Sequence, residues 1–183
     1  MALSHAILTA LLEEDLTGYQ LAKKFDVSLG FFWRASHQQI YQELKRLHQR
    51  EEIHAKEVEQ SGKPNKKIYS LTDQGRESLD RWVLAETRPR AGKDELFVKM
   101  YNVGHSSVEA IAKIVRERRE EHINRLSLYK RIEDRSYRDP FSLPDNKKGI
   151  YLALSAGIRQ EETFIAWCEE AITLLATVEE PSI

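Results

Sequence analysis

The stretch from Ser36 to Leu47 constrains most strongly what this chain can fold into. Apolar residues recur in it at intervals of four and three, which places them on one stripe of an α-helix. These residues are Ile40, Leu44 and Leu47. Serine is a residue type that caps helix starts, so the helix is expected to begin after Ser36. The other side chains are long hydrogen-bonding groups with one acid, Glu43, among them: His37, Gln38, Gln39, Gln42, Lys45 and Arg46.

A polar helix face of this kind has the chemistry needed to read DNA in the major groove. Amide side chains can pair with adenine, histidine and lysine can reach the acceptors of guanine, and cations can neutralise phosphate. The alternative is an ordinary amphipathic helix at the protein surface, since any such helix is polar on one side. The order of the neighbouring elements favours the DNA interpretation.

The residues around this helix predict a small domain with a definite order of elements. Alternating apolar and polar residues over 53–59 and 66–71 predict two strands. Segment 60–65 between them contains the Gly, Pro and Asn that tight loops require. Three more helices are expected, over residues 3–12, after a Thr17 cap, and after a Thr72 cap with Leu79, Trp82 and Val83 as its apolar face. The predicted order is therefore helix, helix, helix, hairpin, helix.

That order is typical of the winged helix-turn-helix, whose third helix enters the major groove and whose hairpin wing contacts phosphate or the minor groove. The basic residues at the wing tip are expected on the same side of the domain as the third helix. Double-stranded DNA is thus the expected partner. The candidate DNA-binding residues are Ser36, His37, Gln38, Gln39, Tyr41, Gln42, Lys45, Lys63, Asn65, Lys66 and Lys67.

The second half of the chain predicts a pair of long helices after a linker over residues 87–93. A charged helix capped by Ser106 is expected to extend to about residue 137, and Pro140 and Pro144 separate it from a last helix. Apolar residues of that last helix recur at intervals of three and four with Glu161 among them, a heptad-like seam. They are Tyr151, Leu154, Ile158, Ile165, Cys168, Ile172 and Leu175.

An antiparallel pair of such helices exposes more apolar seam than it can bury alone, so a homodimer is expected through these seam residues. A two-fold dimer also suits DNA, because two third helices can meet two half-sites. The alternative is that the long helices pack back onto their own winged domain. The predicted fold class is mainly α with a small β-hairpin: a winged helix-turn-helix DNA-binding domain over residues 1–88 and an antiparallel long-helix dimerisation domain over residues 93–178.

Composition limits the other classes of function. The 28 basic and 29 acidic residues nearly cancel, so any attraction to DNA must be local. A single cysteine, Cys168, excludes an internal disulfide and a cysteine-based zinc site. The six histidines lack metal-ligand spacing and the chain has no glycine-rich phosphate loop, so neither an enzyme nor a metal nor a cofactor is expected. The lack of a membrane-span pattern and of a signal-peptide pattern predicts a cytoplasmic protein.

Taken together, these segments resemble the PadR family of transcriptional regulators over the whole chain. The resemblance is carried by the first helix, by Thr17-Gly18-Tyr19, by Trp33, by residues 40–44 and by the wing sequence 62–72. Segment 32–41 and the long C-terminal helices are most similar to the AphA-like virulence-activator branch. The resemblance implies a dimer formed through the C-terminal helices. The chain departs from the family at Glu51-Glu52, where many members have a glycine.

Two other functions stay open at this point. A winged-helix protein-interaction module is the first, and it predicts an acidic or apolar third helix. The second is a PadR-type regulator whose DNA binding is controlled by a small aromatic ligand at the dimer interface. Trp33, Tyr151 and Trp167 are candidates for lining such a pocket, with core packing as the alternative for each.

Overall fold

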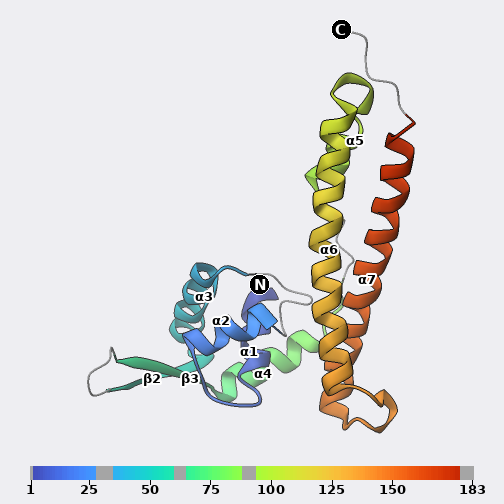
Figure 1. Ribbon diagram of the computed structural model, residues 1–183. Helices are drawn as coiled ribbons and strands as arrows, with labels where there is room; N and C mark the ends of the chain where they lie inside the picture. The colour runs from blue at the N-terminus through green and yellow to red at the C-terminus, as the bar shows by residue number, and fades with distance from the viewer. Residues whose placement is uncertain (1, 28–34, 60–64, 88–93, 178–183) are drawn as a thin grey trace. The chain divides into compact units, whose positions relative to one another are not determined.

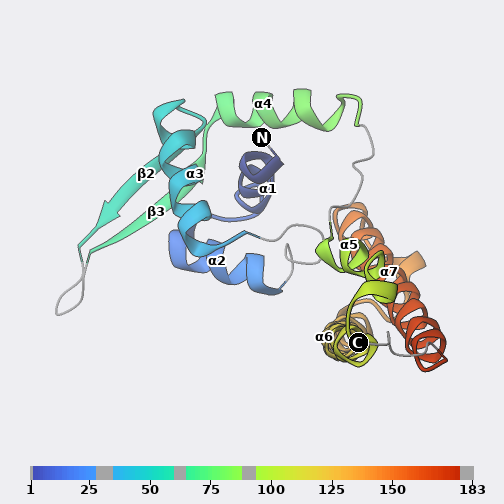
Figure 2. The ribbon, with the colours of Figure 1, turned by 90° about the horizontal axis from the view of Figure 1, so that it is seen from above.

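The computed structural model describes residues 2–27, 35–59, 65–87 and 94–177 of the 183-residue chain. The chain divides into two compact units, Met1–Arg88 and Pro89–Ile183, whose α-helices and longer strands are labelled in Figures 1 and 2. Three features predicted from the sequence lie outside the described residues: Trp33, Lys63 and all of the predicted linker except Thr87.

The first unit contains four helices and a small sheet in its described part. The helices are α1 (Ala2–Ala10), α2 (Gly18–Val27), α3 (His37–Gln49) and α4 (Asp73–Val83). The strands are β1 (Leu16–Thr17), β2 (Ile53–Val58) and β3 (Lys66–Leu71). The antiparallel sheet has the order β1-β3-β2, with Ile53 opposite Leu71 and Val58 opposite Lys66. The predicted order of helices and hairpin is confirmed, and Figure 2 shows the hairpin beside α3.

Strand β1 is an element that the sequence analysis did not predict. It pairs with the far side of the hairpin, where Leu16 lies opposite Tyr69 and Thr17 opposite Ile68. A strand of two residues is too short to show the alternation by which longer strands are predicted. Thr17 also begins α2, because its hydroxyl accepts the Gln20 N–H at 3.2 Å. The predicted cap at Thr17 is therefore confirmed.

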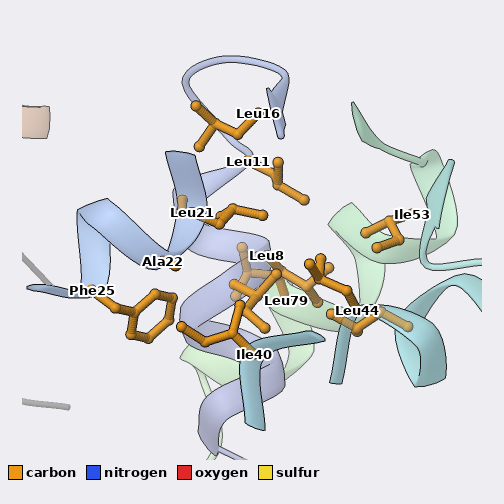
Figure 3. Packing of buried hydrophobic residues seen from close by; sticks show 13 residues of the cluster. Leu8, Leu11, Leu16, Leu21, Ala22, Phe25, Ile40, Leu44, Ile53 and Leu79 are labelled. Atoms are coloured by element: carbon orange, nitrogen blue, oxygen red, sulfur yellow. The ribbon is translucent and has the colours of Figure 1, made fainter. Parts of the chain in front are cut away.

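Apolar side chains from all four helices form the core of the first unit. Ile40, Leu44 and Leu47 of α3 are each 0% exposed, which confirms the stripe predicted from their spacing. Figure 3 shows Ile40 and Leu44 meeting Leu8 and Leu79 in the middle of this core. Because α3 is held by its whole apolar stripe, its opposite face is fixed in direction and available for contacts.

Helix α4 has the predicted cap but only part of the predicted apolar face. Its cap is confirmed, since the Thr72 hydroxyl accepts the Gly75 N–H at 3.0 Å. Its expected apolar face is only partly correct: Leu79 is buried, whereas Val83 is 64% exposed. Trp82 stacks on the ring of His5 at 4.4 Å between centroids. Val83 is exposed because it lies in the last turn of α4, beyond the residues that contact the core.

The second unit consists mainly of two long helices. Its elements are α5 (Glu95–Met100), a 3-10 turn (Val103–His105), α6 (Val108–Ser136), a second 3-10 turn (Pro140–Ser142) and α7 (Asp145–Leu175). Helices α6 and α7 run antiparallel and lie side by side (Figures 1 and 2). The cap of α6 was predicted one residue too early: Ser107, not Ser106, accepts the Ala110 N–H.

Within the ranges 2–27, 35–59, 65–87 and 94–177, no helix has both the length and the apolar character of a membrane span.

Candidate DNA-binding surface

The outward face of α3 is a stripe of amide side chains with one lysine. Gln38, Gln42 and Lys45 are exposed, and their spacing of four and three places them one above another along the helix. Gln49 continues the stripe four residues further on and is also exposed. The sequence analysis missed Gln49, although its spacing from Lys45 gives the same signal. Amides and a lysine in this arrangement can donate to and accept from base edges.

The first turn of α3 uses two of the candidate residues to begin the helix. Ser36 Oγ accepts the Gln39 N–H at 3.2 Å, and Gln39 Oε1 accepts the Ser36 N–H at 2.8 Å. This reciprocal capping box satisfies two backbone donors that the helix leaves without partners. The side-chain oxygen of Gln39 is therefore already hydrogen-bonded within the helix. The side-chain amide nitrogen is the group of Gln39 left to contact DNA. His37 lies exposed at the first helical position.

Tyr41 connects α3 to the start of α2. A Cβ built on Gly18 would lie 2.4 Å from Tyr41 Cε1, so glycine lets the Tyr41 ring lie directly against the start of α2. Tyr69 of β3 lies close to Tyr41, and burial together with this neighbour raises the pKa of the Tyr69 phenol. Tyr69 is thus neutral at physiological pH and keeps its proton to donate. Tyr41 is still 48% exposed, so part of its side chain is accessible to a ligand.

The wing carries several cations on its described part. Asn65, Lys66 and Lys67 are exposed at the start of β3. Lys67 lies opposite Glu57 in the strand pairing, whereas Lys66 lies opposite the apolar Val58. Lys56 on β2 is exposed as well and was not assigned by the sequence analysis. A basic wing beside the stripe of α3 fits the requirement of phosphate contacts flanking base contacts.

The acid Glu43 was expected on the polar face of α3, and this expectation is wrong. Glu43 is 8% exposed and lies on the flank of the helix that faces the protein. Its carboxylate pairs with Arg46 at 3.1 Å and with Arg50 at 3.6 Å. The sequence could not show the pair with Arg50, because Arg50 follows the last turn of the helix. The outward face of α3 is thus free of acids over residues 37–49.

The seam predicted for dimerisation is largely used within the chain itself. Leu154, Ile158, Cys168 and Leu175 are buried, and Cys168 and Leu175 pack in one cluster with Val115 and other residues of α6. Burial raises the pKa of the Cys168 thiol. Tyr151, Ile165 and Ile172 are only half-buried. These three retain surface for a second chain, and their role in a dimer stays a prediction.

A charged cluster lies between α6 and α7. Arg125 Nη1 donates to Glu161 Oε1 at 2.9 Å, and His122 Nδ1 contacts the other oxygen of the same carboxylate. The His122 ring stacks on Phe164 at 4.1 Å between centroids. Nearby, Asp94 caps α5 by accepting the Leu96 N–H, and it also pairs with Arg118 at 2.8 Å. The Leu96 N–H and Arg118 lower the pKa of the Asp94 carboxyl.

An open groove of about 680 Å³ lies beside this cluster. Three aromatic rings form its apolar wall, and charged and polar groups form the rest. Its lining residues are Phe97, His122, Arg125, Arg159, Gln160, Glu161, Thr163, Phe164 and Trp167. In the part of the chain described here, no group of His, Cys, Asp and Glu side chains is arranged to hold a metal ion.

Comparison with protein families assigns both parts of the chain. Residues 7–81 match the transcriptional regulator PadR-like family, and residues 93–176 match the family described as virulence activator alpha C-term. The chain is 40% identical to the probable transcriptional regulator Rv1176c of Mycobacterium tuberculosis, over 96% of this chain and 98% of that protein. It is 31% identical to the negative transcriptional regulator PadR of Bacillus subtilis, over 94% of this chain and 97% of that protein.

Solved structures agree with this assignment. The crystal structure of Bacillus subtilis PadR in complex with operator DNA matches with a TM-score of 0.79 and 31% identity, over 96% of this chain and 99% of that chain. The structure of the Vibrio cholerae virulence activator AphA matches with a TM-score of 0.78 and 30% identity, over 95% and 98%. Bacillus subtilis PadR in complex with p-coumaric acid matches with a TM-score of 0.72 and 30% identity, over 96% and 99%. The resemblance inferred from the sequence is confirmed, and the chain belongs to the PadR-like family of transcriptional regulators.

Proposed function

We propose that this regulator binds DNA in a sequence-specific manner, as a homodimer on a pseudo-palindromic operator. The observation that carries the proposal is the exposed stripe Gln38, Gln42, Lys45 and Gln49 on α3, beside a wing with Lys66 and Lys67. Amides recognise adenine and the lysine reaches guanine, while the wing lysines supply contacts to phosphate. Residues 1–88 are the DNA-binding domain in this proposal. The protein acts by binding, with no catalytic step, and works in the cytoplasm.

The second unit is proposed to form the dimer through residues 93–178. Several large apolar side chains of this unit are exposed, which is unfavourable unless a partner covers them. They are Val98, Tyr101, Phe141, Leu152 and Leu174. A two-fold partner would place two copies of α3 about one turn of DNA apart, as half-site recognition requires.

The test is selection of bound duplexes from a random-sequence pool, followed by sedimentation of the free protein. We expect enrichment of one motif with two-fold symmetry, and a dimer in sedimentation. Binding to random duplex should weaken steeply with salt. A monomer, or enrichment of a motif without two-fold symmetry, would contradict the proposed mode of binding. Absence of any DNA binding would favour the protein-interaction module instead, although the amide stripe of α3 lacks the acidic or apolar character expected of it.

A second candidate function is control of DNA binding by a small aromatic acid. It is favoured by the groove of the second unit, where Phe97, Phe164 and Trp167 offer flat apolar surfaces and Arg125 and Arg159 offer positive charge. The 30% identical Bacillus subtilis PadR has been crystallised with p-coumaric acid, which has this combination of ring and carboxylate. Titration calorimetry with p-coumarate tests the idea. Binding that is lost in Trp167→Ala and that weakens affinity for DNA would support it, and no heat of binding would contradict it.

A further inference from the structure

Helix α3 carries one buried acid, Glu43, and two arginines pair with it. The Glu43 side chain is 11% exposed, whereas the Arg46 and Arg50 side chains that pair with it are 67% and 51% exposed. Arg46 Nη1 donates to Glu43 Oε2 at 3.1 Å, and Arg50 Nη2 lies 3.6 Å from Glu43 Oε1. Both arginines therefore reach from solvent back toward a carboxylate at the edge of the core.

The same arrangement includes a second buried acid at the corner where α3 leads into β2. Arg50 Nη2 lies 3.1 Å from Glu52 Oε2, and the Glu52 side chain is only 13% exposed. Ser78 of α4 donates to Glu52 Oε1 at 2.9 Å. A Cβ on Gly75 would lie 2.0 Å from the Glu52 carbonyl oxygen, so α4 approaches this corner closely. Two acids and two arginines thus form a cluster with no net charge, and Ser78 of α4 holds one of the acids by a hydrogen bond. The four residues are Glu43, Arg46, Arg50 and Glu52.

Burial of the two acids decides where the arginines stay. A carboxylate removed from water is strongly disfavoured unless a cation compensates it, whereas a guanidinium at the surface is solvated with or without a partner. If Arg46 or Arg50 moved to a DNA phosphate, Glu43 would be left buried with less compensation. The free energy gained at the phosphate would be reduced by that cost. The pairs are therefore more strongly held than ordinary pairs at an exposed surface.

The position of Arg46 makes its pair with Glu43 relevant to DNA binding. It follows Lys45 and lies four residues after Gln42, so it lies on the flank of the amide stripe. Phosphates line both edges of a major groove in which a helix is seated, and cations there bind all sequences alike. Freed from Glu43, Arg46 would add attraction that carries no information about sequence, whereas Arg50 would still have Glu52 at 3.1 Å.

We propose that Glu43 is a specificity-determining residue, which limits sequence-independent binding by keeping Arg46 and Arg50 paired and away from phosphate. This inference rests on the proposed reading of DNA by α3. Glu43 contacts no base in this account and acts only through the two arginines. Removing its charge should therefore strengthen binding to random DNA, which is the opposite of the usual effect of a substitution in a DNA-binding helix.

The decisive variant is Glu43→Gln, which keeps the shape of the side chain and removes the charge. Affinity for a random-sequence duplex is measured for the full-length protein as a function of salt. The slope of log affinity against log salt should steepen by about 0.9 for each arginine released. With one arginine released, affinity at 0.1 M salt should rise about five- to tenfold. Thermal unfolding followed by circular dichroism verifies that the variant is folded.

Glu77→Gln is the matched control, because it removes the same charge from an exposed pair with Arg81 on α4. Its salt slope should equal that of the parent. An equal steepening in both variants would assign the effect to net charge and overturn the proposal. An unchanged or shallower slope in folded Glu43→Gln would also overturn it. A gain on the duplex selected by the parent that exceeds the gain on random duplex would contradict it too, because the arginines would then be reading sequence.

Arg46→Ala in the parent keeps the proposal testable if Glu43→Gln does not fold. A paired Arg46 contributes no phosphate contact, so the salt slope on random duplex should stay unchanged. A fall of about 0.9 would show that Arg46 binds phosphate in the parent and would refute the proposal. Failure of the parent to select any sequence would instead refute the proposed function. The salt slopes on random duplex are measured separately, so the two failures can be told apart.

Discussion

The two units of this chain bury their side chains in different ways. The core of the first unit is built from aliphatic and aromatic side chains, among them Ile7, Leu21 and Leu44, all 0% exposed. The second unit places the carboxylate of Glu161 between its long helices, where Arg125 pairs with it and His122 contacts it. A dry core needs no particular partner for any one group, whereas a buried charge fixes which residues must face each other. The first unit has its buried acid, Glu43, at the edge of the core, whereas the second unit has Glu161 between its two long helices.

Both units leave large apolar side chains exposed, but on different elements: in the first unit Trp82, Val83 and Leu84 lie together at the end of α4. In the second unit Tyr101, directly after α5, and Phe141, in the 3-10 turn between α6 and α7, are 90% and 95% exposed. Helix pairs bury less apolar area per residue than a domain with several packed layers. In the proposal a partner chain covers the exposed apolar side chains of the second unit, while DNA contacts the exposed polar face of α3 in the first. The predictions below test that division.

The largest effect is expected from Ile165→Asp, at a half-buried position of the proposed dimer surface. A charge there must be buried without compensation, at a cost of several kcal/mol, or the interface must open. We expect sedimentation to report a monomer whose affinity for DNA falls to that of a single half-site. Thr163→Asp, two residues away and exposed, should stay dimeric. A dimeric Ile165→Asp with full affinity would show that the partner binds elsewhere.

Leu44→Ala should destabilise the first unit strongly, because it empties a fully buried site in the core shown in Figure 3. The expected loss is about 2–5 kcal/mol of the free energy of unfolding, measured by urea denaturation. Leu84→Ala is the control, since Leu84 is 88% exposed and should change stability by less than about 0.5 kcal/mol. Equal losses in the two variants would mean that the core of the first unit is not what stabilises it.

The wing lysines should affect DNA binding without affecting stability. Replacing Lys66 and Lys67 by alanine should reduce the salt slope on random duplex by about 0.9 for each phosphate contact removed. The loss should be the same for selected and random duplexes, because phosphate contacts carry no sequence information. A loss confined to the selected duplex would instead assign these lysines to base recognition.

The smallest effect is expected from Asp94→Asn, which keeps the cap of α5 and removes its charge. The Leu96 N–H and Arg118 lower the pKa of Asp94, so its charge stabilises the fold at neutral pH. The expected loss at pH 7 is about 0.3–1 kcal/mol. Because the folded pKa is the lower one, the parent's advantage should be full above the unfolded pKa of about 3.9 and vanish as pH falls through the folded value. Urea denaturation at several pH values measures this difference, and a pH-independent difference would contradict it.

The fold was largely predictable because its elements repeat at helix and strand periods. Ile40, Leu44 and Leu47 were identified as core from spacing alone, and they are fully buried. Arg46 lies three residues after Glu43, which spacing can show, but Arg50 reaches both Glu43 and Glu52 only where α3 leads into β2, and spacing could not show that. Periodicity likewise found the α7 seam without showing that Cys168 and Leu175 would face α6 of the same chain. Spacing reveals which face of a helix is apolar, but not what covers that face.

The most direct test of the account compares Gln42→Ala with Lys66→Ala on the selected and the random duplex. The central claim is that the amide stripe of α3 reads sequence while the wing binds phosphate. We expect Gln42→Ala to lower affinity for the selected duplex by roughly 1–3 kcal/mol and to leave affinity for the random duplex unchanged. Lys66→Ala should lower both equally. If Gln42→Ala bound both duplexes as the parent does, or weakened both alike, α3 would not be the reading helix.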